Sequence, residues 1–470
     1  MSAASLIRQV ARQTDWWFDG PLLSPLRQIG AGLLVAAGPW ILAIVTLTLI
    51  GAATEPRLGA VVLEDMRLAI VYAFMLGPIV AAPAGVIAAR AVTDAVGTDA
   101  EVPVGAILLI AAGIAGIGAE ALAATVTLIF GLTDPGLALA FAVLTAVSAM
   151  MWTAFPVLTA CRARHRLIVA FAVGMAAALG LSLAVAGIAR SGADVVWCFT
   201  TGIALCFALC VVPLDPAALT PAALRDAARR LGGAGRSAWP LALGASLAIA
   251  GVWADKWVAW AWTGGQVSAA GFRHLPAYDS ALFLAQLSVL PGLAAIAMFY
   301  EGPVRAAMAR FRSELMRGTS LSGAERAVGV VAARLWTGLG RITVAQAALS
   351  AALILASPAL AAAGGLRLDQ LLLLRTGIAG AFLHMILLAA SGVLILANRK
   401  AAFAAVQAAF LGFNLALSAT LAAGGHLSAL GFAGAAALAA ALTVVLAMQT
   451  VRELLRHVFL SGNDGLFRSD

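Results

Sequence analysis

The sequence has little charge for its length. Only 11% of the 470 residues are Asp, Glu, Lys or Arg, whereas a soluble domain carries roughly 25%. Apolar residues make up 62% of the chain. So few charges cannot solvate the exterior of a soluble chain of this length. The composition therefore excludes a soluble enzyme and predicts an integral membrane protein.

Lysine is scarcer still, and its scarcity excludes nucleotide-driven transport by this chain. The two lysines, Lys256 and Lys400, are preceded by Asp255 and Arg399, so no G-x-x-x-x-G-K-[ST] loop exists. The chain is therefore not itself an ATP-driven pump. The net charge of +8 indicates membrane orientation rather than a nucleic-acid partner, because the basic residues gather in alternate connections.

The residues that could bind a metal or form a covalent intermediate do not occur at the spacing that such sites need. No two of the five histidines lie within four residues, which excludes an H-E-x-x-H zinc site. No D-x-D or G-x-S-x-G occurs, which counts against a sugar-nucleotide transferase and an α/β-hydrolase. The four cysteines suggest no disulfide framework, since three of them lie in one apolar run. We therefore expect a carrier with no cofactor, no metal and no catalytic residue.

Long apolar runs are what the sequence does have. A spanning helix needs roughly 20 apolar residues, and twelve such runs occur in two sets of six. They predict an all-α polytopic protein whose spans lie at about 28–52, 66–90, 103–130, 137–160, 166–189, 192–213, 239–263, 278–303, 338–361, 368–396, 401–423 and 427–450.

The basic residues orient these spans. With the N-terminus inside, 23 Lys and Arg fall in inside segments and six in outside segments. This bias predicts that both termini are cytoplasmic. The first 27 residues lack a continuous apolar stretch, so the first span should act as its own insertion signal.

The domain organisation follows from the spans. We expect two six-helix lobes, joined by a cytoplasmic linker and flanked by cytoplasmic ends. The predicted parts are an N-terminal segment 1–27, an N-lobe 28–213, a linker 214–238, a C-lobe 239–450 with a cytoplasmic helical loop 304–337, and a tail 451–470.

The loop 304–337 is amphipathic. Val304, Met308, Phe311 and Leu315 share one helix face, and Ser322 to Glu325 resembles a capping box that opens a further helix. One interpretation is an interfacial helix held by anionic lipid, and the other is a docking site for a cytoplasmic partner. The partner-docking candidates are Arg305, Arg310, Arg312 and Arg317.

Ionisable and polar side chains within spans are costly and therefore candidates for function. Asp255 and Lys256 are adjacent, so they point about 100° apart and cannot pair across one helix face. Each therefore needs a partner on another helix or water. Lys256 could instead snorkel outward, Glu120 and Asp255 could be structural hydrogen-bonding groups, and His384 could be a satisfied interior group. The cavity candidates of this kind are Glu120, Asp255, Lys256, Arg375, His384 and Asn414.

The seventh span is also rich in tryptophan. Trp253, Trp257 and Trp260 fall at i, i+4 and i+7 and so form one stripe. The stripe is typical of an aromatic belt at the membrane surface. The alternative is a surface on which sugar rings stack inside a cavity, with Trp253 and Trp257 as cavity candidates.

Four stretches carry a resemblance to a known family. LLVAAGPWILAIVTLTLIG and YAFMLGPIVAAPAGVIAARAVTDAVG cover the first two spans. GVWADKWVAWAWTGG and HLPAYDSALFLAQLSVLPGLAAIAMFYEGPVRAAMARF cover the seventh, the eighth and the helix that follows. Together they resemble the inner-membrane transporter family of the Pel exopolysaccharide system, the PelG family.

The resemblance implies a fold and a function. The fold would be that of the multidrug/oligosaccharidyl-lipid/polysaccharide exporter (MOP) superfamily, which includes the MATE transporters. The substrate would be a polysaccharide rich in N-acetylgalactosamine, moved from cytoplasm to periplasm across the bacterial inner membrane during biofilm formation. The implied partners are a cytoplasmic glycosyltransferase and membrane subunits of a secretion complex, one of which senses cyclic di-GMP.

Other functions stay open at this point. An ion-coupled MATE-like exporter of small cationic or amphipathic molecules would exchange a proton at Glu120 or Asp255. A flippase would carry a lipid-linked oligosaccharide on the same fold. A membrane scaffold for a glycosyltransferase would place the function in 214–238 and 304–337.

Overall fold

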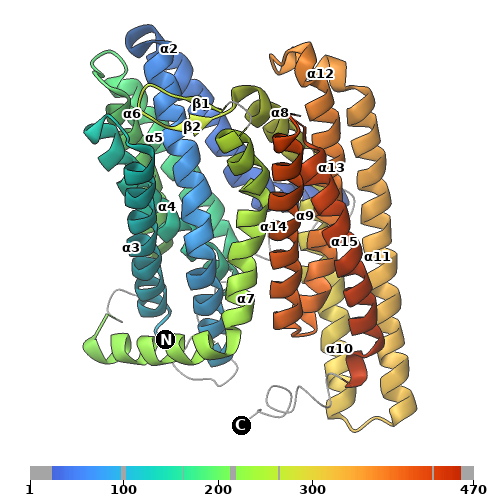
Figure 1. Ribbon diagram of the computed structural model, residues 1–470. Coiled ribbons are helices and arrows are strands. Elements are labelled where there is room, and N and C mark those ends of the chain that lie inside the picture. Colours follow the sequence, from blue (N-terminus) through green and yellow to red (C-terminus); the bar gives the residue numbers. More distant parts are fainter. Residues whose placement is uncertain are drawn as a thin grey trace. The chain divides into compact units, whose positions relative to one another are not determined.

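The structure is a computed structural model that describes residues 24–96, 102–161, 163–211, 219–262, 265–425 and 428–456 (Figure 1). Most of the predicted N-terminal segment 1–27 and the tail beyond residue 456 lie outside these residues. The chain forms two compact units. Of the described residues, those within 1–24, 37–250 and 265–274 form unit 1, and those within 25–36, 251–264 and 275–470 form unit 2.

Most of unit 1 is built from apolar helices of membrane-spanning length. Thr145, Thr153 and Thr200 are buried and each donates its hydroxyl to the carbonyl four residues earlier, which satisfies the hydroxyl without another helix. Its helices besides α7 are α2 (Ser24–Val96), α3 (Val104–Phe130), α4 (Pro135–Ala160), α5 (Arg164–Val185) and α6 (Gly192–Val211).

The first two predicted spans meet at Gly59 without a loop. Gly59 has φ 78° and ψ 163°, which interrupts the helical backbone of α2. A side chain would be strained at this backbone conformation, and glycine adopts it readily. Gly59 therefore divides α2 into the two helices that the apolar runs 28–52 and 66–90 predict.

A two-stranded hairpin is attached to α2. Strand β1 (Gln266–Val267) pairs antiparallel with β2 (Arg273–His274). The buried carboxylate of Asp65 accepts a hydrogen bond from Ala270 N at 3.0 Å, and Tyr72 donates to Arg273 O at 2.6 Å. These contacts explain why a segment that follows α7 in sequence belongs to unit 1.

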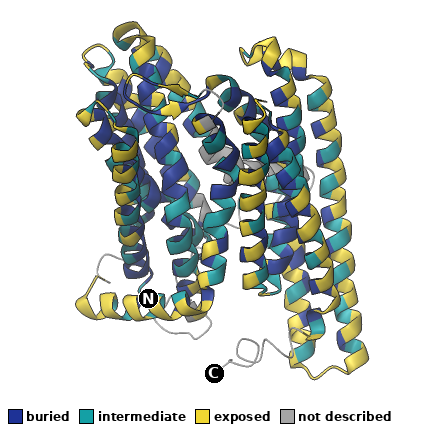
Figure 2. Cartoon of the chain, in the orientation of Figure 1, coloured by how far each residue is buried: buried dark blue, intermediate teal, exposed yellow. Residues whose placement is uncertain are grey.

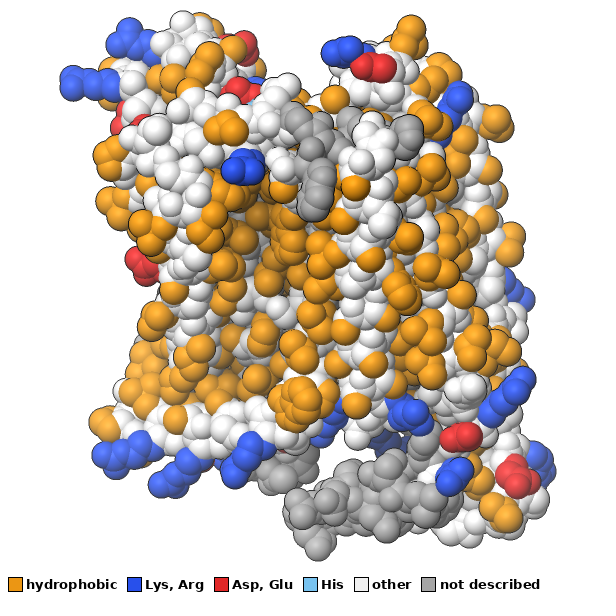
Figure 3. Space-filling model, viewed as in Figure 1, with side chains coloured by type: hydrophobic (Ala, Val, Ile, Leu, Met, Phe, Trp, Pro, Cys, Tyr) orange, Lys and Arg blue, Asp and Glu red, His pale blue; other side chains and the backbone are white. Residues whose placement is uncertain are grey.

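Helix α7 (Pro221–Trp262) is 42 residues long and includes most of the predicted linker 214–238. Its first part runs across the ends of neighbouring helices, and its second part turns along them (Figure 1). Pro240 lies inside the helix and explains a bend, because proline removes a backbone hydrogen bond. Basic side chains line one edge of the first part, with hydrophobic side chains beside them (Figure 3). The linker is therefore an amphipathic helix continuous with the seventh span.

Unit 2 contains residues 25–36 of α2, the last turns of α7 and the remaining helices. Buried residues gather on the helix faces turned into each unit, while many apolar residues on the outer faces are exposed, as expected of membrane spans (Figure 2). The helical segments after the hairpin are α8 (Pro276–Leu287), α9 (Leu290–Phe299), η3 (Tyr300–Val304), α10 (Arg305–Met316), α11 (Leu321–Leu355), α12 (Ser357–Ala363), η4 (Leu368–Gln370), α13 (Leu371–Leu396), α14 (Lys400–Ala423) and α15 (Leu430–Arg452).

The predicted eighth span is broken. Helices α8 and α9 meet at 40°, and Gln346 of α11 donates to Ser288 O at the break at 2.9 Å. Gln346 also donates to Ser350 Oγ at 3.2 Å. A side-chain amide thus satisfies a carbonyl that the interrupted helix leaves free.

The loop 304–337 is helical, but it is not an interfacial helix. Val304 of η3 and Phe311 of α10 are buried against Val331 and Leu335 of α11, so the apolar face that one interpretation assigned to lipid packs on a neighbouring helix. The capping residue was also wrongly placed. Ser320, not Ser322, caps α11 by accepting a hydrogen bond from Gly323 N.

The described residues contain ten helices long and apolar enough to cross a membrane, and the bent pair makes an eleventh. One of the ten, Leu42–Asp94, contains the break at Gly59. Each of the twelve predicted runs overlaps a helical segment, although the run 338–361 falls on the second half of α11 and on α12. The all-α polytopic fold is confirmed.

Candidate functional site

The polar residues predicted within the later spans meet in the core of unit 2. Asp255 and Lys256 come from α7, Tyr278 from α8 and Asn414 from α14. Asp255, Tyr278 and Asn414 are each at most 2% exposed, and Lys256 is 4% exposed. A buried polar group is costly unless it is paired, so the contacts of each group define the site.

Asp255 is held by two other helices. Tyr278 Oη donates to Asp255 Oδ2 at 2.8 Å, and Asn414 Nδ2 donates to Asp255 Oδ1 at 3.3 Å. Asn414 Nδ2 also lies 2.8 Å from Gly251 O, and its Oδ1 accepts from Ser418 Oγ at 3.1 Å. The prediction that Asp255 needs partners on other helices is correct.

Lys256 does not snorkel outward. Its Nζ lies 3.5 Å from both carboxylate oxygens of Asp255 and donates to Val252 O at 3.1 Å. It also lies 5.5 Å from the ring centre of Trp253 and 5.9 Å from that of Phe432. The expectation that adjacent residues could not pair is wrong, because the long lysine side chain bends back along its own helix.

The tryptophan stripe divides into two parts. Trp260 is buried and its Nε1 donates to both carboxylate oxygens of Asp279 at 3.0 Å, so it is not a belt residue. Asp279 also accepts from Leu275 N at 2.9 Å, which fixes the start of α8. Trp253 and Trp257 are half-buried and stay candidates for contact with a ligand.

His384 lies beside this cluster, between aromatic rings. It stacks on Phe410 at 4.9 Å between ring centres and lies 6.2 Å from Phe432. Its Nε2 is buried without a hydrogen-bond partner among the described residues. The interpretation of His384 as a fully satisfied interior group is therefore wrong for this nitrogen.

Two glycines make room for the same rings. A Cβ on Gly251 would lie 2.6 Å from Phe410, and a Cβ on Gly380 would lie 2.7 Å from Phe432. Small residues at these points allow α14 to approach α7 and α15 to approach α13. The aromatic lining of the site depends on both glycines.

Two predicted candidates lie outside this cluster. Glu120 is an exposed residue of α3 in unit 1. Arg375 is exposed near the start of α13, where its Nε donates to Ser357 Oγ at 2.8 Å and joins α13 to α12. The structure therefore gathers Trp253, Asp255, Lys256, His384 and Asn414 but neither Glu120 nor Arg375.

Sequence reasoning missed Tyr278, Asp279, Phe410 and Phe432. The rarity of tyrosine was a usable signal for the first of them. The chain has three tyrosines, and Tyr72, Tyr278 and Tyr300 all donate hydrogen bonds to residues far away in sequence. Nothing in the sequence distinguishes Phe410 and Phe432 from the other phenylalanines.

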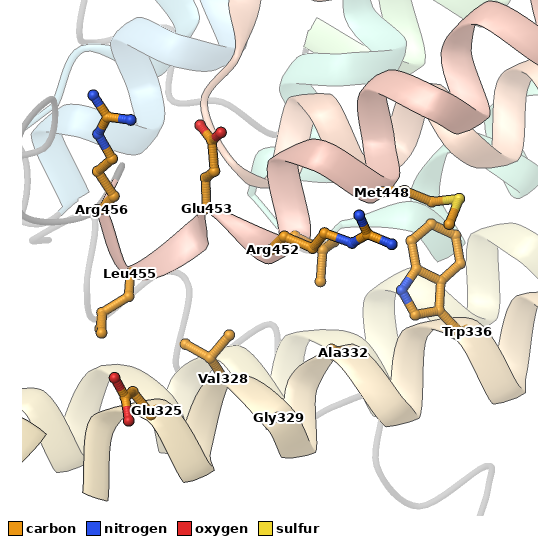
Figure 4. A pocket seen from close by; sticks show the side chains of 11 residues that line it. Glu325, Val328, Gly329, Ala332, Trp336, Met448, Arg452, Glu453, Leu455 and Arg456 are labelled. Carbon is orange, nitrogen blue, oxygen red and sulfur yellow. The ribbon is translucent and has the colours of Figure 1, made fainter. Parts of the chain in front are cut away.

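A second region of interest lies at the ends of α10, α11 and α15. Two concave surfaces open there, of about 410 Å³ between α10 and α11 and about 800 Å³ between α11 and α15. Trp336, Met448 and Arg452 lie together at one end of the larger pocket (Figure 4). The docking candidates Arg305, Arg310, Arg312 and Arg317 are all exposed, and Arg310 lines the smaller pocket.

Solved transporter structures share this fold. An outward-facing multidrug resistance MATE family transporter of the MOP superfamily is 15% identical, with a TM-score of 0.64 over 98% of this chain and 99% of that one. MATE in the bent conformation is 15% identical, with a TM-score of 0.63 over 97% and 99%. A MOP superfamily transporter from Pyrococcus furiosus is 12% identical, with a TM-score of 0.63 over 97% and 99%. At these identities the likeness shows the fold alone.

The sequence itself matches a family over nearly its whole length. No curated protein gives a significant match. Residues 19–459 match PelG, described as "Putative exopolysaccharide Exporter (EPS-E)". The match confirms the resemblance carried by the first, second, seventh and eighth spans. The chain is a multi-pass membrane transporter, and it belongs to the PelG family of exopolysaccharide exporters.

Proposed function

We propose that this protein moves a Pel-like polysaccharide, rich in N-acetylgalactosamine, from cytoplasm to periplasm across the bacterial inner membrane. The observation that carries the proposal is the family match over residues 19–459. The composition supports a carrier, since the chain contains no nucleotide-binding loop of the P-loop type.

The cluster in unit 2 is the proposed site of contact with the glycan. A pyranose ring has an apolar face that stacks on an indole, and its hydroxyls exchange hydrogen bonds with amides and carboxylates. Trp253 and Trp257 are half-buried and supply the stacking surface. Asp255, Lys256 and Asn414 are buried, and their hydrogen bonds join α14 to the part of α7 that carries the two tryptophans.

The proposed cytoplasmic partner is a glycosyltransferase that makes the polymer. Exposed arginines on α10 and the pockets beside α11 offer charge and concavity for such a partner. Helices α10 and α11 are packed on each other through Phe311, Val331 and Leu335, with Val304 of η3 in the same cluster, so they form a firm platform for docking. Other membrane subunits of the secretion complex are proposed partners as well.

Gene deletion followed by complementation tests the export function. Loss of the protein should leave polymer or precursor inside the cell and remove extracellular glycan, detected with a lectin for N-acetylgalactosamine. Trp253→Ala and Trp257→Ala should lower secreted glycan, whereas Trp239→Ala, at an exposed position 61% accessible to solvent, should not. Extracellular glycan unchanged on deletion would contradict the proposal.

The same variants separate a transporter from a scaffold. A scaffold would need only its docking surfaces, so Trp253→Ala would leave secretion intact. Loss of secretion with normal co-purification of the glycosyltransferase supports transport by this chain. The double substitution of Arg305 and Arg312 by alanine should instead weaken co-purification of the glycosyltransferase, because both arginines belong to the proposed docking surface.

A further inference from the structure

The groups around the Lys256 ammonium form a cage of cation ligands. Nζ faces both oxygens of Asp255, the carbonyl of Val252, and the rings of Trp253 and Phe432. Carboxylate and carbonyl oxygens bind hard cations, and aromatic faces attract any cation that has lost its water. All five groups belong to unit 2, and the ammonium is the cation that they surround.

The cage does not depend on the lysine for its shape. The distance of 3.5 Å from Nζ to Asp255 exceeds that of a short charge-assisted hydrogen bond. The shorter bonds to the carboxylate come from Tyr278 at 2.8 Å and Asn414 at 3.3 Å. Asn414 is itself fixed by Gly251 O and Ser418. These contacts would keep the carboxylate in place if the ammonium were removed.

We infer that Lys256 is the built-in cation of a monovalent-cation site, and that the native chain therefore takes up no sodium or potassium ion at Asp255. A carboxylate in the core of a transporter is otherwise a ready site for a coupling ion. Here the side-chain ammonium neutralises it, with the Lys256 side chain 5% exposed and that of Asp255 0% exposed. Removal of the ammonium leaves a buried carboxylate without its counter-charge, which a small cation from solution can replace.

Substitution of Lys256 tests the inference in the purified full-length protein without any glycan. Its outcome is therefore independent of the proposed export function. Thermal unfolding is followed in N-methylglucamine, sodium and potassium chloride at equal ionic strength. The native protein should unfold at the same temperature in all three salts.

Lys256→Ala opens space for an ion beside an intact carboxylate. It should unfold several degrees lower in N-methylglucamine chloride and recover with a saturable dependence on sodium or potassium. Asp255→Asn combined with Lys256→Ala should show no such recovery, because the carboxylate is gone. Lys256→Met fills the space with an apolar chain and should be destabilised without recovery.

Two results would overturn the inference. One is that sodium or potassium raises the unfolding temperature of the native protein and that this effect is lost in Asp255→Asn. The other is that Lys256→Ala unfolds at the same lowered temperature in all three salts. If Lys256→Ala does not accumulate, Lys256→Gln takes its place, because it retains a hydrogen-bonding side chain of similar length. The same comparison of the three salts then tests the inference.

Discussion

Tyr278 donates a hydrogen bond of 2.8 Å to Asp255 from the first turn of the neighbouring helix α8, and both side chains are buried. A hydrogen bond to a carboxylate is stronger than one to a neutral acceptor, and its loss leaves a charged oxygen less satisfied. This contact joins the most polar position of the seventh span to the eighth.

Tyr278→Phe should therefore destabilise the protein by about 1.5–3 kcal/mol, the usual contribution of a hydrogen bond to a charged group. Tyr300→Phe is the matched control, because Tyr300 donates to the neutral carbonyl of Ala389 at 2.6 Å. The control should cost about 0.5–1.5 kcal/mol, as for a neutral hydrogen bond. Thermal unfolding in detergent measures both, and an equal effect of the two variants would contradict the prediction.

Gly251→Ala should destabilise the protein because its new Cβ would lie 2.6 Å from the ring of Phe410. Overpacking of this kind costs about 1–3 kcal/mol. Gly412→Ala lies on α14 with nothing within 4 Å of its new Cβ. That control should be neutral or stabilising by up to about 1 kcal/mol, since alanine is the better helix former. Equal unfolding temperatures for the two variants would show that Phe410 moves aside freely.

The first part of α7 should bind anionic lipid. Arg225, Arg229 and Arg236 are exposed, whereas Arg230 is already paired with Asp226 at 2.7 Å. Each basic residue near an anionic surface contributes about 1 kcal/mol at moderate salt. The triple substitution of the three exposed arginines by glutamine should abolish most of the extra stability measured in phosphatidylglycerol over phosphatidylcholine nanodiscs. Arg230→Gln should change that difference less. A triple variant that keeps the full extra stability of the native protein in phosphatidylglycerol would contradict the prediction.

Cys161 should react slowly with maleimide in the folded protein. It follows α4, outside the spanning helices, and burial raises the pKa of its thiol to about 11 although Arg166 acts in the opposite direction. The thiolate is the reactive form, so labelling should stay slow near neutral pH and accelerate only well into the alkaline range or on unfolding.

The raised pKa of the Cys161 thiol also determines how the stability of the protein changes with pH. A raised pKa means that the folded state favours the protonated thiol. Its contribution to stability is complete below about pH 8.5, the ordinary value for cysteine, and is lost as the pH rises towards 11.

The variant used for maleimide labelling carries Cys198→Ala, Cys206→Ala and Cys210→Ala, so that Cys161 is its remaining cysteine. Rapid labelling of this folded variant at neutral pH would contradict the prediction.

The fold could be predicted from the sequence because a bilayer imposes one simple requirement. Every backbone polar group must be satisfied within its own segment, so an apolar run of sufficient length becomes a helix. The run 28–52 illustrates this, since it lies inside the helical segment that begins at Ser24. The interpretation of 304–337 as an interfacial helix was wrong, because amphipathic periodicity alone does not say whether an apolar face meets lipid or another helix.

The site could be predicted only in part. Asp255, Lys256 and Asn414 stood out because polar groups within apolar runs are rare. Their pairing could not be predicted, since Tyr278 and Asn414 lie 23 and 159 residues from Asp255. Glu120 stood out for the same reason as Asp255, yet it lies on an exposed side of α3. Rarity identifies a costly residue, and only tertiary packing tells which of them meet.

The attachment of the hairpin to α2 limits how the gene can be divided. Unit 1 includes residues 265–274, although the chain has already entered unit 2 at Gly251. Separate expression of residues before and after a cut in 251–264 would leave the hairpin on the fragment without Asp65 and Tyr72, the residues that bind it. Neither unit corresponds to one uninterrupted coding stretch. Fragment complementation of this transporter therefore has to restore hydrogen bonds between the fragments, not merely bring two finished domains together.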